Sequence, residues 1–141
     1  MTRYLLIVLL ILAGCAQLPP PPGDAAAKKF ETVPDRAVIY VARHVLDKDF
    51  AAPIMLDGQP IGPTYKGTYM RIVVPAGAHR ISGFAGDGGS IQIKTEPGKL
   101  YFINQSVSGF RSIDTSTFQL VDAKHGRTLV LNGTLTNEIN R

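Results

Sequence analysis

Residues 69–84 read YMRIVVPAGAHRISGF and contain two runs of β-forming residues on either side of a turn. Val, Ile and aromatic residues favour a pleated strand and Pro75-Ala76-Gly77 interrupts the run, so strands are predicted at Tyr69–Val74 and His79–Phe84. Similar short runs, separated by Gly, Pro and Asp, follow Pro34 along the rest of the chain. They predict further strands at Ala37–Arg43, Ile54–Leu56, Gln59–Ile61, Ser90–Thr95, Leu100–Ser106, Phe118–Val121 and Thr128–Leu131. No long helical period appears in this part of the sequence. The pattern predicts an all-β protein, an antiparallel β-sandwich of the immunoglobulin-like type, with a small, partly open barrel as the alternative.

Alternating apolar positions indicate which side chains of each strand face the core. Asp57-Gly58 is the strongest turn signal, because a two-residue type I′ turn requires positive φ at both central positions and Asp-Gly tolerates that. The domain would have about 105 residues, which is enough to bury a core without disulfides. The side chains expected to face inward are Ile39, Val41, Met70, Ile72, Val74, Ile91, Ile93, Leu100, Phe102, Phe118, Leu120, Leu129 and Leu131.

The N-terminal residues have the layout of an export signal. Arg3 precedes an uninterrupted apolar stretch, Tyr4–Leu12, which is too short for a bilayer span of about 20 residues. The stretch leads into Leu12-Ala13-Gly14-Cys15, which resembles a bacterial lipobox. The resemblance implies acylation of the Cys15 sulfur, cleavage between Gly14 and Cys15, and attachment to a lipid bilayer. Ala16, rather than Asp, follows the cysteine, and by analogy with Gram-negative lipoproteins this favours an outer-membrane lipoprotein facing the periplasm. The alternatives are an ordinary secretory signal and a short anchor that is never cleaved.

Three segments follow from this layout. Residues 1–14 are expected to be the signal peptide, residues 15–35 the lipidated cysteine with a Pro- and Ala-rich tether, and residues 36–141 the β-sandwich domain. The four prolines before Gly23 favour an extended tether, and a short helix over Asp24–Glu31, capped by Asp24, is compatible with the three alanines there.

Composition excludes several classes of function. Cys15 is the single cysteine, so no disulfide framework and no structural zinc site are expected, and no motif calls for a cofactor. The 15 Lys and Arg residues exceed the 11 Asp and Glu residues only slightly and form no basic run, which argues against nucleic-acid binding. The sequence does not specify an oligomeric state.

Several motifs resemble an uncharacterised family of bacterial lipoprotein and periplasmic domains, similar in look to PEGA-type β-sandwich modules. The motifs are Tyr40-Val41-Ala42-Arg43, Leu56-Asp57-Gly58, Gly62, Gly67-Thr68-Tyr69, Pro75-Ala76-Gly77-Ala78-His79 and Gly98-Lys99-Leu100-Tyr101-Phe102. The resemblance covers roughly Ala37 to Ser106. The chain departs from the family pattern at Ala42 and Phe102, where aromatic and Tyr residues are common. The resemblance implies the sandwich fold and no particular activity.

Aromatic and basic residues suggest an exposed recognition surface. Tyr69 and Arg71 share one face of a strand, opposite the face assigned to the core, and Tyr101 lies near Lys99 in sequence. Exposed Tyr and Arg are enriched where binding energy concentrates. Phe110 and Arg111, in an expected loop over 106–116, form a second candidate. We therefore expect a non-catalytic binding or structural module for an envelope protein or a cell-wall component.

The alternative is a small periplasmic hydrolase or a metal-dependent enzyme. His79 could act as an acid-base group or ligand contact, but we expect instead that its side chain bonds a nearby backbone group and fixes the turn. His44, Asp47 and Asp49 could ligate a metal, although Lys48 interrupts the carboxylates and the spacing matches no established pattern. No GxSxG elbow is present for a serine nucleophile, and His125 is expected at a hairpin tip.

Overall fold

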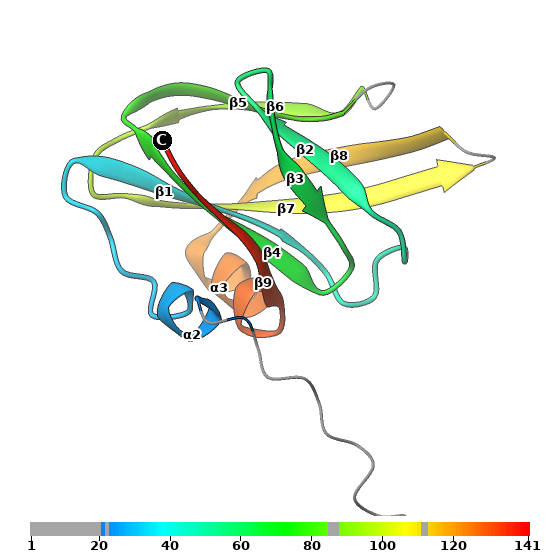
Figure 1. Ribbon diagram of the computed structural model, residues 1–141, viewed down its shortest axis with the longest axis horizontal. Helices are drawn as coiled ribbons and strands as arrows, with labels where there is room; N and C mark the ends of the chain where they lie inside the picture. The colour runs from blue at the N-terminus through cyan, green and yellow to red at the C-terminus, as the bar shows by residue number, and fades with distance from the viewer. Residues whose placement is uncertain (1–20, 22, 85–87, 111–112) are drawn as a thin grey trace, which may run out of the picture.

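The structure is a computed structural model that describes residues 21, 23–84, 88–110 and 113–141. Two sheets pack face to face, and two helices cover the outer face of the larger sheet (Figure 1). The five-stranded sheet has the order β8 (Ile113–Val121), β7 (Leu100–Phe110), β1 (Arg36–Arg43), β4 (Thr68–Pro75) and β9 (Thr134–Asn140). The four-stranded sheet has the order β3 (Gln59–Thr64), β2 (Ala52–Leu56), β5 (Gly77–Gly83) and β6 (Ser90–Thr95). The predicted all-β sandwich is confirmed, and the two sheets do not close into a barrel.

Strand β1 lies at the centre of the five-stranded sheet and is buried on both faces. Its residues from Ala37 to Arg43 are at most 2% exposed. It pairs antiparallel with β4 and parallel with β7, and β4 in turn pairs parallel with β9. The larger sheet is therefore mixed, so the predicted antiparallel arrangement is wrong for it, whereas the smaller sheet is antiparallel throughout. Burial on both faces explains why β1 is an almost continuous apolar run.

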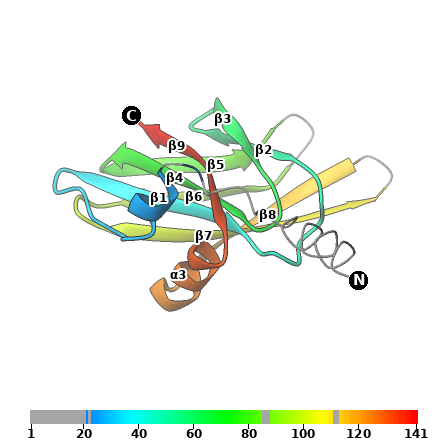
Figure 2. The same cartoon turned by 60° about the horizontal axis from the view of Figure 1, so that its bottom comes forward.

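Two hydrophobic clusters lie on opposite faces of the five-stranded sheet. The first fills the space between the sheets and contains Ala37, Ile39, Val41, Ile54, Leu56, Ile61, Met70, Ile72, Val74, Ile81, Ile93, Ile103 and Phe118. The second lies under α2 (Asp24–Ala27) and α3 (Ala123–Leu131) and contains Ala27, Val38, Tyr40, Ala42, Tyr69, Val73, Phe102, Leu129, Val130 and Leu135. Figure 2 turns this helix-covered face toward the viewer.

The expected inward orientation is wrong for five residues, one of which is Leu129, buried in the second cluster rather than between the sheets. Leu100 and Phe102 were expected between the sheets, but the parallel register with β1 places Tyr101 and Ile103 there and turns Phe102 toward the helices. Leu120 and Leu131 are 49% and 55% exposed. For Leu100 and Phe102 the second apolar layer is the cause, because a strand covered on both faces has two apolar sides and alternation does not indicate which one lies between the sheets.

The strand predicted at Thr128–Leu131 is wrong, since these residues end helix α3. Asp122 caps this helix, and its carboxylate accepts a hydrogen bond of 2.9 Å from the backbone N–H of His125. His125 is therefore in the first turn of a helix rather than at a hairpin tip. Leu129 and Val130 look like strand residues locally, but they face the second cluster one helical turn away from the buried Gly126. The strand that follows, β9, was missed because it is short of apolar residues.

The segment before β1 is not a free tether up to residue 35. Helix α2 packs on the domain through Asp24 and Ala27, which are both 4% exposed. Gly23, not Asp24, occupies the N-cap position of this helix, and Asp24 instead turns inward. The backbone carbonyl of Ala27 accepts a hydrogen bond of 2.7 Å from the hydroxyl of Tyr40. The folded domain thus begins near Gly23.

The loop expected over 106–116 is a hairpin instead. Strands β7 and β8 pair antiparallel from Phe102 opposite Val121 to Phe110 opposite Ile113. The hairpin extends beyond the body of the sandwich (Figure 1). Among the described residues, no helix has the length and apolar character needed to cross a membrane.

Candidate functional site: a hollow lined by arginines

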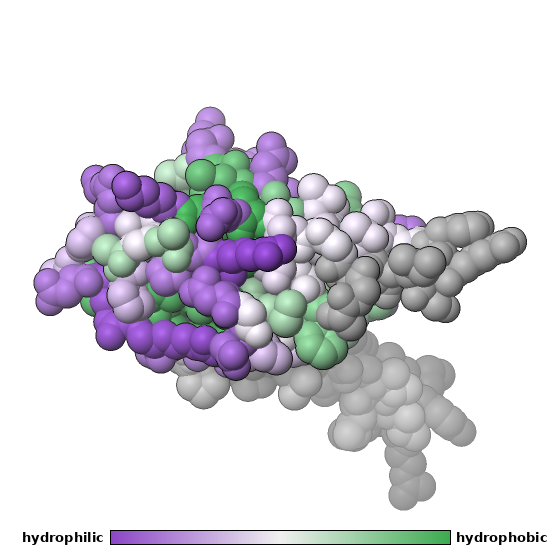
Figure 3. All heavy atoms as spheres, turned by 90° about the horizontal axis from the view of Figure 1, so that it is seen from above, coloured by the Kyte–Doolittle hydropathy of each residue, from purple (hydrophilic) through white to green (hydrophobic). Residues whose placement is uncertain are grey.

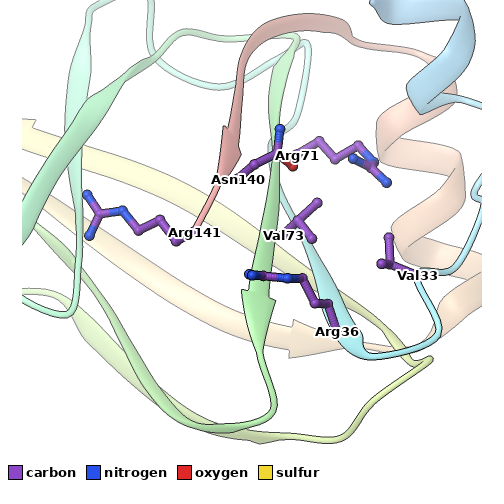
Figure 4. A pocket seen from close by; sticks show the side chains of 6 residues that line it. All are labelled: Val33, Arg36, Arg71, Val73, Asn140 and Arg141. Carbon is purple, nitrogen blue, oxygen red and sulfur yellow. The ribbon is translucent and has the colours of Figure 1, made fainter.

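A hollow of about 350 Å³ opens on the helix-covered face of the five-stranded sheet, beside the segment that leads into β1. We call it the arginine hollow, and its lining residues are Val33, Arg36, Arg71, Val73, Asn140 and Arg141. Its volume lies at the lower end of the range for small-molecule sites, about 300–1,000 Å³. Figure 4 shows its side chains at close range.

Strand register brings the lining residues together from distant parts of the sequence. Arg36 begins β1 and lies opposite Pro75 of β4, so that it is close to Val73 on the neighbouring strand. Arg71 and Val73 share the face of β4 that carries Tyr69, as the period of two requires. Asn140 of β9 lies opposite Val73, and the N–H of Arg141 donates a hydrogen bond of 3.0 Å to the Val73 carbonyl.

The three arginines differ in how their charges are engaged. Arg71 forms an ion pair with Glu138, with side chains that are 13% and 38% exposed. Arg36 has one buried guanidinium nitrogen, Nη1, for which the described residues offer no hydrogen-bond partner. Figure 4 shows the Arg36 guanidinium directed toward β4, whereas the Arg71 and Arg141 side chains extend in opposite directions. Arg36 is therefore the cation of the hollow that is left without an acceptor.

The site touches the aromatic cluster beneath the helices. Burial raises the pKa of Tyr40, and the nearby Arg71 guanidinium opposes this shift only in part. The Tyr40 hydroxyl therefore remains protonated at neutral pH and donates a hydrogen bond to the Ala27 carbonyl. Its ring stacks on Phe102 with centroids 5.3 Å apart.

Guanidinium groups beside an amide and two valines suit one kind of ligand. Guanidinium N–H groups bind carboxylate and phosphate oxygens strongly, and the valines offer an apolar surface next to the charge. The arrangement can bind an anionic group carried by a partly apolar molecule.

The recognition surface expected from the sequence is not assembled as predicted. Tyr69 shares a face with Arg71, as expected, but it is 0% exposed because the helices cover it, so its predicted exposure is wrong. Tyr101 is partly buried and packs against the first cluster, between the sheets, and its hydroxyl accepts a hydrogen bond of 3.0 Å from the N–H of Glu96. Of the predicted strip, only Arg71 lines the hollow.

Four predicted residues cannot be placed. Phe110 ends β7, but its side chain lies outside the described part of the structure, as does the whole of Arg111. Gly14 and Cys15, the predicted cleavage and lipidation site, also lie outside the described residues.

His79 fixes its neighbouring turn, which is the structural role considered for it from the sequence. Its Nε2 lies 2.8 Å from the Pro75 carbonyl and its Nδ1 lies 2.8 Å from Oδ2 of Asp57. The other carboxylate oxygen of Asp57 accepts a hydrogen bond of 2.7 Å from the N–H of Arg80. Burial raises the pKa of Asp57, but the bonds from His79 and Arg80 outweigh it and lower the pKa overall. His79 thus joins its own turn to the Asp57-Gly58 turn.

His44, Asp47 and Asp49 do not form one cluster. Nδ1 of His44 accepts a hydrogen bond from the N–H of Leu46, and Asp49 pairs with Lys66. Asp47 pairs at 3.0 Å with Arg43, whose side chain is fully buried. Within the described ranges, no group of three or more His, Cys, Asp or Glu residues is arranged to hold a metal ion.

Sequence reasoning missed Arg36, Asn140 and Arg141. The first predicted strand began at Ala37, one residue after Arg36. Because β1 in fact begins at Arg36, this residue shares the helix-covered face of the strand with Val38, two positions later. Asn140 ends β9 and Arg141 follows it, and no local pattern of apolar residues indicates this mostly polar strand.

Comparison of the chain with protein-family models, with curated proteins and with solved structures finds no match in any of the three.

Proposed function

We propose that the chain is a lipoprotein of the bacterial envelope, anchored through acylated Cys15 in the outer membrane and facing the periplasm. Its β-sandwich is a non-catalytic binding module, and the arginine hollow is its ligand site. The observation that carries the binding role is the buried Nη1 of Arg36 without a partner among the described residues. A buried donor without an acceptor costs about 1–3 kcal/mol, so a ligand that supplies an acceptor gains that much.

Two further observations support this proposal. The lipobox-like Leu12-Ala13-Gly14-Cys15 follows an apolar stretch of signal-peptide length. The histidines and carboxylates considered for catalysis have structural partners instead: His79 is bonded to Asp57 and Pro75, and Asp47 to Arg43.

The anchor is tested by labelling cells that express the chain with radioactive palmitate. We expect label in the protein and recovery in the outer-membrane fraction, and we expect Cys15→Ser to abolish both. An unlabelled wild-type protein, or a Cys15→Ser protein that fractionates as before, would contradict the anchor.

The binding role is tested by crosslinking in intact cells, comparing the wild type with Arg36→Gln. A binding module predicts a crosslinked species that weakens in Arg36→Gln. Arg80→Gln is a matched control, because Arg80 is an exposed arginine on the four-stranded sheet. Equal crosslinking by all three chains would refute a ligand site at the hollow.

A further inference from the structure

We propose that the arginine hollow binds the phosphate group of a membrane phospholipid, an inference that rests on the proposed anchor. Phosphate oxygens would accept from the Arg36 guanidinium once its Nη1, which is buried and unpartnered among the described residues, turns into the hollow, and the valines would lie against the glycerol and the first methylenes of the lipid.

The chemistry of the hollow favours a single anion. Arg71 is already paired with Glu138, so the hollow does not hold three free cations. Arg36 supplies the unsatisfied donor, and Asn140, which also lines the hollow, is an amide that can donate or accept. Val33 and Val73 add apolar surface to the lining of the hollow, beside the Arg36 guanidinium.

The entry point of the chain selects a lipid as the source of that anion. Helix α2 docks on the same face of the five-stranded sheet on which the hollow opens. Only about eight peptide units separate Cys15 from Gly23, and a fully extended chain of that length spans at most about 28 Å. The outer face of the four-stranded sheet lies two layers away, about 20 Å further from this entry point. The tether therefore starts from the helix-covered face, which carries the hollow, and an acyl group on Cys15 lies within about 28 Å of its attachment point at Gly23.

Helix α3 presents suitable side chains on the same face. Lys124, Arg127 and Leu131 follow each other at helical spacing on its exposed side, and Leu131 is 55% exposed. The Arg127 guanidinium lies 4.9 Å from the centre of the Phe30 ring. A stripe of two cations and one leucine suits the boundary between headgroups and acyl chains.

The proposed binding does not rest on general attraction between the net positive charge of the protein and anionic lipids. The exposed Glu31 and Asp35 lie in the segment between α2 and β1 and offset part of the positive charge. Hydrophilic side chains also gather at one end of the opposite face, which Figure 3 shows from above the four-stranded sheet. Binding should therefore depend on the residues of the hollow rather than on net charge.

The test uses the mature chain, residues 15–141, with Cys15→Ser so that it carries no lipid. Sedimentation is measured with vesicles of phosphatidylglycerol mixed with phosphatidylcholine. We expect the chain to sediment with them, and Arg36→Gln to weaken this binding about tenfold, as the loss of one charge-assisted hydrogen bond predicts. Arg71→Gln should also weaken it. Arg80→Gln removes the same charge from the other sheet and should leave binding within about twofold.

Two results would overturn the proposal. Equal weakening of vesicle binding by Arg36→Gln and Arg80→Gln would mean that binding depends on overall charge rather than on the hollow. Absence of binding to the vesicles would refute a lipid as the ligand. Titration with inorganic phosphate separates the sources: tight, Arg36-dependent binding of free phosphate without vesicle binding assigns a soluble anion and overturns the lipid. Urea unfolding of each variant verifies the fold. Because the chain tested carries no acyl group, failure here is distinct from failure of palmitate labelling.

Discussion

The hydroxyl of Tyr69 donates a hydrogen bond of 2.9 Å to Oδ1 of Asp24, across 45 positions of the sequence. The same carboxylate accepts a bond of 2.8 Å from the N–H of Leu135 and pairs at 2.8 Å with Lys28. One buried aspartate therefore fastens the segment next to the proposed anchor to strands β4 and β9.

Tyr69→Phe is predicted to lower the free energy of unfolding by about 2 kcal/mol, because it removes a buried hydrogen bond to a charged group. Tyr101→Phe is the control, since the Tyr101 hydroxyl bonds an exposed backbone N–H and its loss should cost about 1 kcal/mol or less. Urea unfolding measures both. Equal effects of the two substitutions would contradict the special role of the Asp24 contact.

Stability is predicted to fall in acid through Asp24 and Asp57. Burial raises the pKa of Asp24, but bonds from Lys28, Leu135 and Tyr69 outweigh it and place the folded-state pKa below the ordinary 3.8. Folding thus favours the ionised form, and this stabilisation is complete above about pH 4 and is lost as the pH falls through the lowered folded-state pKa. Urea midpoints measured from neutral pH downward should decrease in that window. Asp24→Asn should flatten the decrease, while Asp35→Asn, on the exposed part of the same segment, should leave it unchanged.

Gly126→Ala is predicted to destabilise the protein, although alanine favours a helix over glycine by about 1 kcal/mol. A Cβ at Gly126 would lie 2.2 Å from Cβ and Cγ of Phe102, and the stacking of Phe102 on Tyr40 resists its displacement. We expect a loss of about 2 kcal/mol or more in chemical unfolding. His125→Ala changes the exposed neighbouring position and should be neutral or stabilising. A stabilised Gly126→Ala protein would show that α3 does not pack this closely on β7.

Arg43→Met is predicted to cost about 3–5 kcal/mol, because it leaves a buried carboxylate without its partner. The guanidinium donates to Asp47 at 3.0 Å and to the carbonyls of Phe50, Thr64 and Lys48 at 2.8, 3.1 and 2.7 Å.

Lys66→Met is the control for this substitution. Lys66 pairs with Asp49 at a similar 2.9 Å, but the two side chains are 43% and 75% exposed, so its loss should cost about 0.5 kcal/mol or less. Comparable losses in the two variants would mean that burial does not govern the strength of these pairs.

Local sequence patterns predicted most strands because their information is short-range. Asp57 and Gly58 have φ values of 50° and 80°, as the predicted type I′ turn requires. The run from Ala37 to Arg43 identified β1 through side-chain chemistry alone, and the expected turn-fixing role of His79 is confirmed by its contact with Pro75.

The candidate site was predicted only through Arg71. Arg36 has no local signal, since an arginine at the start of a strand is ordinary, and it becomes notable only because folding buries one of its nitrogens without a partner among the described residues. For Tyr69 the prediction was partly wrong. The alternation assigned the correct face of β4 to its side chain, but it does not indicate that helices cover that face and bury the residue.

Amino-acid order alone specified the elements whose stability depends on neighbours in sequence: the tight turns, the strand periodicity and the signal-like N-terminal layout. Long-range packing specified that residues 128–131 are helical, that β9 pairs parallel with β4, and that Asp24, at the start of α2, is buried against Tyr69 and Leu135. The physical reason is that turns and alternation reflect the conformational preferences of adjacent residues. The state of an apolar segment or a lone charge depends instead on the surface it meets after the chain has folded.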